Sequence, residues 1–233
     1  MSELPEPSGA VIYHPFVVHG LPSAVVVNAP PVAPEQRKRP RPGERRLQIL
    51  QTLATMLQEP GADRITTAAL AARLAVSEAA LYRHFASKAQ MFEALIEFIE
   101  SSVFSLINQI TEQGGQPAAQ AQRIVLVLLQ FGEKNPGMVR VMVGDALVFE
   151  HERLMQRMNQ FFDRVEGQLR QCLRVAGDAD GELAPTAQGQ AHAQALASGL
   201  TALVAGRLQR FARSGFRRSP TEHLDSLLAH WLP

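Results

Sequence analysis

The chain has 233 residues, a formal net charge of +1, and 46% hydrophobic and 19% charged residues. This length suffices for one or two domains with a real core, and the near-neutral charge means that the distribution of basic residues matters more than their sum. The single cysteine, Cys172, excludes an internal disulfide and a cysteine-based zinc site. No stretch of about 18 apolar residues is free of proline and charge, and no basic secretory signal is present. We therefore expect a soluble cytoplasmic protein.

Residues 1–42 hold nine of the fifteen prolines. Proline fixes φ and lacks an amide donor, so we predict a disordered or loosely extended tail. A basic arm lies at the end of this tail: Arg37, Lys38, Arg39 and Arg41. A run of charge is usually a solvated linker, but its place before the first helix favours an arm that lies on DNA phosphates or in the minor groove.

Residues 43–58 are predicted to form the first helix, which Pro60 and Gly61 end. Its expected buried stripe consists of Leu47, Leu50, Ala54 and Leu57.

Residues 65–88 read as two short helices joined by a tight turn, with a third beginning at the end. Thr66, Ser77 and Ser87 are expected N-caps, and Ala75 with Val76 forms the turn. Six residues are expected to point inward: Leu70, Ala71, Leu74, Ala80, Leu81 and Phe85. A second helix with a buried seam and a small, polar outer face fits the recognition helix of a helix-turn-helix.

The run A-V-S-x-x-x-L-Y-R-H-F-x-S-K, residues 75–88, resembles the DNA-binding signature of the TetR family of bacterial regulators. The alternative is an ordinary helical hairpin with Leu81 and Phe85 as core. Ala75 stands where that family usually has glycine, and a left-handed alanine would cost about 1 kcal/mol. Besides the basic arm, the predicted DNA-contacting residues are Thr66, Thr67, Ser77, Glu78, Ala79, Tyr82, Arg83 and Lys88.

Six further helices are predicted, with no convincing strand. Their expected ranges are 88–112, 118–134, 138–143, 146–175, 186–213 and a last helix capped by Thr221. The prediction is an all-α, TetR-like fold, with a three-helix DNA-binding domain over 43–87 and a helical dimerisation and partner-binding domain over 88–233.

The helix over 186–213 is rich in small residues that allow close helix approach. The resemblance implies a four-helix dimer interface made by the last two helices of each subunit. The residues expected there are Ala195, Gly199, Ala202 and Gly206. Close packing within one subunit would explain the same pattern.

Three longer segments, beginning at Ile65, Arg123 and Phe149, resemble the nucleoid occlusion factors of that family. The resemblance implies a homodimer, or a dimer of dimers, on palindromic double-stranded DNA. It also implies capture of the C-terminal tail of the division GTPase FtsZ between the fourth and fifth helices. By position, the tail contacts are Phe98, Val127, Lys134 and Asn135. Phe98 and Val127 suit plain core packing equally well, and Leu106 and Gln130 depart from the family's usual Arg and Gly.

The seven histidines are scattered, and we recognise no catalytic triad, carboxylate pair or phosphate-binding glycine loop. We expect no enzymatic activity, no cofactor and no metal. The alternative function is a transcriptional repressor released by a small ligand, which requires an enclosed pocket with convergent polar groups in the second domain.

Overall fold

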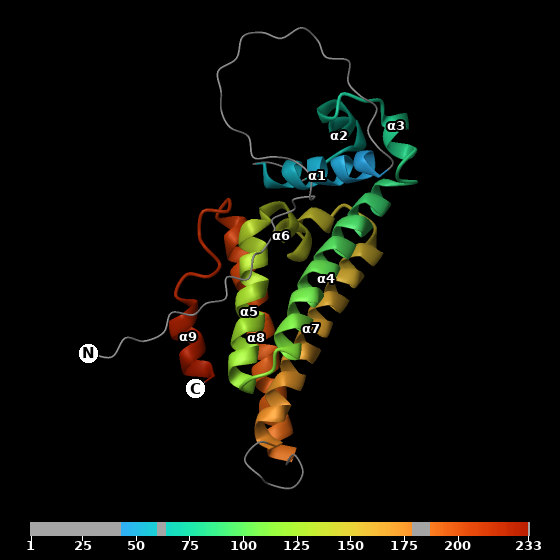
Figure 1. Ribbon diagram of the computed structural model, residues 1–233. Coiled ribbons are helices and arrows are strands. Elements are labelled where there is room, and N and C mark those ends of the chain that lie inside the picture. Colours follow the sequence, from blue (N-terminus) through green and yellow to red (C-terminus); the bar gives the residue numbers. More distant parts are fainter. Residues whose placement is uncertain (1–42, 60–63, 179–186, 233) are drawn as a thin grey trace, which may run out of the picture. The chain divides into compact units, whose positions relative to one another are not determined.

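The computed structural model of the protein describes residues 43–59, 64–178 and 187–232. Across these residues the secondary structure is helical, with nine α-helices and no strand (Figure 1). They belong to one compact unit that spans residues 40–233. The predicted all-α class is confirmed, while the proline-rich tail and the basic arm lie outside the described residues. No helix in the described ranges is long and apolar enough to cross a membrane.

The first three helices are α1 (Glu44–Gln58), α2 (Thr67–Arg73) and α3 (Glu78–Tyr82). The predicted stripe of α1 was wrong in part, because Leu47 and Ala54 are only half-buried. The buried residues of α1 are Ile49, Leu50, Leu53, Met56 and Leu57. The stripe is rotated because α1 packs on both α2 and α6.

Contact with α6 depends on Gly137, where a Cβ would lie 2.1 Å from the carbonyl oxygen of Ala54. No side chain fits there without moving the backbone of α1.

The two long helices α4 (Lys88–Glu112) and α5 (Pro117–Lys134) pack on each other. Ser87 caps α4 as predicted, since its hydroxyl accepts from the amide of Gln90 at 3.2 Å. Helix α5 begins one residue earlier than predicted, because Pro117 occupies the first helical position instead of ending a loop. Proline suits that position because its missing amide would have had no partner there.

The segment after α5 forms α6 (Pro136–Met142), a 3-10 turn η1 (Asp145–Leu147) and α7 (Glu152–Asp178). The prediction of one helix over 146–175 was therefore wrong at its start. The first part is the separate turn η1, and α7 begins only after His151, whose ring nitrogen accepts from the amide of Arg153. Apolar periodicity continues across the break, so the pattern gave no sign of it.

The last helices are α8 (Ala187–Arg213) and α9 (Leu224–Trp231). Thr221 does not cap α9 as predicted. The cap position is His223, in the left-handed region with φ 56°, and the hydroxyl of Thr221 lies instead by Ser219 and Glu133.

Helix α5 is central to the second half of the chain, with contacts to α4, α6, α7 and α8. Its inner residues Ile124, Val125, Leu128 and Leu129 have no exposed surface. Cys172 on α7 is buried, and burial raises the pKa of its thiol.

Candidate nucleic-acid interface

The turn between α2 and α3 is held by side-chain caps at both helix starts. The hydroxyl of Thr66 accepts from the amide of Ala69 at 3.1 Å, and that of Ser77 accepts from the amide of Ala80 at 3.3 Å. Both predicted caps are confirmed. A third bond joins the two starts directly, because the Thr67 hydroxyl donates to Glu78 Oε2 at 2.5 Å. The polar residues expected to face DNA therefore also fix the angle between the two helices.

Helix α3 has one buried side and one open side. Leu81 and the nearby Phe85 are each 1% exposed, whereas Tyr82 is 46% exposed. The predicted DNA-contacting residues at this end are all exposed: Ser77, Glu78, Ala79, Tyr82 and Arg83. A five-residue helix held by two large core side chains, with small and polar groups outward, has the form needed to enter a major groove.

Arg46 of α1 contacts the segment just after α3, a role that was not predicted from the sequence. Its guanidinium donates to the carbonyl of His84 at 2.9 Å and lies 4.1 Å from the centroid of the Phe85 ring. Both contacts anchor the segment just after α3. The sequence shows an arginine at this position of α1 but does not reveal its partner, because His84 lies 38 residues away.

Lys88 lies at the start of α4, where its ammonium pairs with the carboxylate of Glu150. It also lies 5.6 Å from the centroid of the Phe92 ring. Glu150 is well buried, with a side-chain exposure of 9%, so the pair joins the start of α4 to the segment before α7. Lys88 thus has a structural partner, and its DNA contact stays a prediction.

The residues predicted for partner binding lie along the seam of α4 and α5. Phe98 is half-buried, and its ring centroid is 6.3 Å from that of Phe131 on α5. Val127 is 4% exposed and belongs to the core, while Lys134 is exposed at the end of α5. Asn135 follows, half-buried, and its side-chain amide donates to the carbonyl of Phe131 at 2.8 Å. Phe98 and Asn135 thus both contact Phe131, Lys134 is exposed at the end of the same helix, and Val127 is buried.

The residues that depart from the resembled pattern lie on the same two helices. Leu106 of α4 and Gln130 of α5 are both half-buried. Compared with Arg and Gly at those positions, Leu106 carries one cation fewer, and Gln130 adds a polar amide.

The small residues of α8 lie mainly on an open face. Ala195, Ala202 and Gly206 are exposed, and no described atom lies within 4 Å of the position that a Cβ on Gly206 would occupy. Gly199 is half-buried, and a Cβ there would lie 3.7 Å from the ring of Trp231 on α9. Packing within the described chain accounts for the small residue at Gly199. Ala195, Ala202 and Gly206 remain exposed to solvent.

No group of three or more His, Cys, Asp or Glu side chains in the described ranges is arranged to hold a metal ion.

Two family models match the chain. The model for bacterial regulatory proteins of the tetR family matches residues 49–95, and an SlmA-like model of the tetracyclin repressor-like C-terminal domain matches residues 116–231. The chain is 50% identical over 183 residues to the nucleoid occlusion factors SlmA of Escherichia fergusonii and Citrobacter koseri, covering 78% of this chain and 90% of each relative.

Among solved structures, the fold is similar to that of the MbdR regulator from Azoarcus sp. CIB, with a TM-score of 0.63 at 19% identity. That match covers 79% of this chain and 95% of the regulator.

Proposed function

Because the chain belongs to the SlmA family of TetR-type nucleoid occlusion factors, we propose that it binds palindromic chromosomal sites as a dimer and, from there, captures FtsZ and blocks division-ring assembly over the nucleoid. The observation that carries the DNA-binding part is the open side of α3 above the buried Leu81 and Phe85. The relatives are named as nucleoid occlusion factors, and one matching family model is that of bacterial regulatory proteins, so the proposal includes no enzymatic activity. The proposal places the protein at the nucleoid.

Each half of a palindrome needs its own recognition helix. We assign phosphate contacts to the hydroxyls of Thr66 and Tyr82, and base-edge contacts to the outer face of α3. The basic arm before α1 adds sequence-independent affinity through counterion release. The open small-residue face of α8, made of Ala195, Ala202 and Gly206, supports a two-fold interface with a second copy.

For FtsZ, the support is an apolar seam that ends in a cation. Phe98 and Phe131 lie together between α4 and α5, and Lys134 is exposed at the end of α5. An acidic, partly apolar peptide would place an apolar side chain by Phe98 and its negative charge by Lys134. Val127 would form the floor of this site, and Asn135 would position the end of α5.

The alternative is a repressor that releases DNA when a small molecule enters its second domain. Such a site needs a cavity with convergent polar groups. The inner side of α5 is instead aliphatic and fully buried at Ile124, Val125, Leu128 and Leu129. These fully buried side chains favour partner capture at the surface over ligand binding inside the bundle.

Reversal of the charge at Lys134 tests the partner site. Lys134 lies at a helix C-terminus, where a cation gains from the helix dipole, so Lys134→Glu should cost well under about 1–2 kcal/mol of stability. We expect the variant to lose binding of the FtsZ tail peptide. It should keep its DNA affinity, because the DNA contacts are assigned to α3 and Lys134 lies on α5. Both ligands are titrated in the same buffer.

The matched control is Arg174→Glu, which reverses an exposed charge on α7. It should leave both affinities unchanged. Normal tail binding by Lys134→Glu would remove this residue from the partner site and leave it as a helix end.

A further inference from the structure

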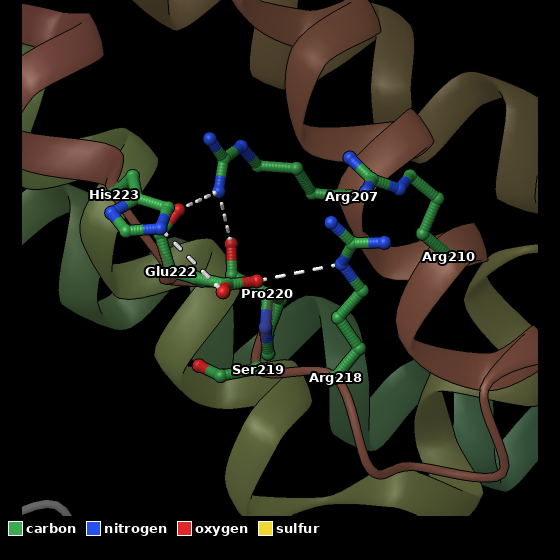
Figure 2. A pocket seen from close by; sticks show the side chains of 7 residues that line it. All are labelled: Arg207, Arg210, Arg218, Ser219, Pro220, Glu222 and His223. Carbon is green, nitrogen blue, oxygen red and sulfur yellow. Dashed lines mark hydrogen bonds and ion pairs between the residues drawn. The ribbon is translucent and has the colours of Figure 1, made fainter.

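Three arginines surround a cavity of about 110 Å³ between α8 and the loop that leads to α9 (Figure 2). Arg207 and Arg210 come from α8, and Arg218 comes from the loop. We call this cavity the arginine pocket. Its volume exceeds that of several water molecules, so it has room for a tetrahedral oxyanion.

The pocket is built on fixed bonds. Arg207 Nη1 donates to two loop carbonyls, that of Pro220 at 3.0 Å and that of Glu222 at 2.7 Å. On the other side of the loop, the hydroxyl of Ser219 donates to Glu133 Oε1 of α5 at 2.6 Å. These hydrogen bonds join the loop to α8 and to α5, and they restrict the movement of its backbone relative to the three guanidinium groups.

Positive charge in the pocket exceeds negative charge. The one carboxylate in the lining, Glu222, lies 3.4 Å from Arg218 Nε and 3.6 Å from the ring of His223. Within the described chain, nothing accepts a hydrogen bond from the guanidinium of Arg210. Burial, and then the charge of Arg210, lower the pKa of Arg207, and Glu222 opposes them in part. An anion between the two α8 arginines would relieve their mutual repulsion.

The three arginines and the one glutamate of the lining together carry a formal charge of +2. A carboxylate would balance half of this charge, whereas a phosphate monoester carries close to −2 at neutral pH. The planar guanidinium fork also matches the oxygen spacing of phosphate. We propose that the arginine pocket binds a phosphate dianion, either as free inorganic phosphate or as the terminal phosphate of a small molecule.

A bound dianion would link the two arginines of α8 to Arg218 of the loop. Since the loop leads directly into α9, the ion would hold α8 and α9 together. Phosphodiesters of DNA carry one negative charge each and do not match the pocket. The site is therefore separate from the DNA contacts assigned to α3, and its test does not depend on the proposed function.

The test is a calorimetric titration of the full chain at constant ionic strength with inorganic phosphate, with adenosine monophosphate and with dimethyl phosphate. We expect saturable binding of one dianion per chain and none of dimethyl phosphate. Tighter binding of the nucleotide than of phosphate would identify a phosphorylated small molecule as the ligand. Equal or weaker binding of the nucleotide would identify the free ion.

Arg210→Ala should weaken dianion binding about tenfold or more. It breaks no hydrogen bond to a described residue, so the melting temperature without ligand should be unchanged. Arg213→Ala, which removes an exposed arginine outside the pocket from the same helix, should bind as the unmodified chain does. Absence of saturable binding, equal binding of dimethyl phosphate, or equal weakening by the two variants would overturn the proposal.

Discussion

Ala75 adopts the left-handed conformation, with φ 53°, at the turn between α2 and α3. The resembled family usually has glycine at this position, and strain was expected only if the alanine were left-handed, which the structure confirms. A Cβ in this region costs about 1–2 kcal/mol. The turn requires a left-handed residue, and the methyl group of alanine makes that conformation less favourable than it would be for glycine.

Ala75→Gly should therefore raise the free energy of unfolding by up to about 1 kcal/mol, after allowance for the greater entropy of glycine in the unfolded chain. Denaturant melts measure the change. Ala72→Gly is the matched control, because Ala72 is exposed within helix α2; there glycine should lower stability by about 0.5–1 kcal/mol. Equal losses for both variants would show that Ala75 carries no strain.

Thr66 caps α2 and, in our proposal, also contacts a DNA phosphate. Its oxygen accepts from the amide of Ala69, which leaves its own hydrogen free to donate to a phosphate. Thr66→Ala should weaken binding to every duplex alike, by about 1–2 kcal/mol with the lost cap included. Fluorescence anisotropy with a selected palindrome and an unrelated duplex measures both affinities.

Thr55→Ala is the control for Thr66, since among the described residues that hydroxyl bonds to the carbonyl of Gln51 in its own helix α1. A loss at the palindrome alone would mean that Thr66 reads sequence, contrary to the phosphate assignment.

At the scale of elements, regular periodicity and good caps predicted most helices to within a residue or two. The caps at Thr66, Ser77 and Ser87 are local, so sequence suffices for them. The errors arose where residues distant in the sequence determine the cap or the buried side of a helix. The hydroxyl of Thr221 bonds to Glu133 on α5 and does not cap α9, and the buried stripe of α1 turns toward α6, whose Gly137 lies against α1. Neither partner is visible in a local window.

The open face of α8 carries the prediction for the dimer. No described atom lies within 4 Å of the position that a Cβ on Gly206 would occupy, so Gly206→Leu should not disturb the single subunit. It should disrupt a closely packed two-fold interface and give monomers that lose palindrome affinity, because two half-sites need two linked helices. Analytical ultracentrifugation and DNA binding measure both effects.

Gly167→Leu is the matched control, since a Cβ on Gly167 of α7 would also meet nothing within 4 Å among the described atoms. It should remain dimeric. A dimer of unchanged stability in Gly206→Leu would place the interface elsewhere on the molecule.

At the scale of the whole molecule, the signature at residues 75–88 predicted the fold family, and the longer segments predicted the group within it. The candidate site was only partly predictable. The outer face of α3 follows from helical periodicity, but the Arg46 anchor and the Lys88–Glu150 pair need the tertiary fold. Val127 matches the partner-binding stretch in sequence, yet it is buried. It lies in the run of aliphatic residues 124–129 of α5, where periodicity does not distinguish the inner side from the outer side.

The most direct test of the account is FtsZ capture by the immobilised full chain, with and without a duplex that the chain itself has selected from a random pool. We predict that FtsZ is retained, that retention increases when the duplex is bound, and that free FtsZ tail peptide abolishes it. If FtsZ is not retained in either state while the duplex binds normally, the central claim is wrong, and the protein is a DNA-binding factor that acts without this partner.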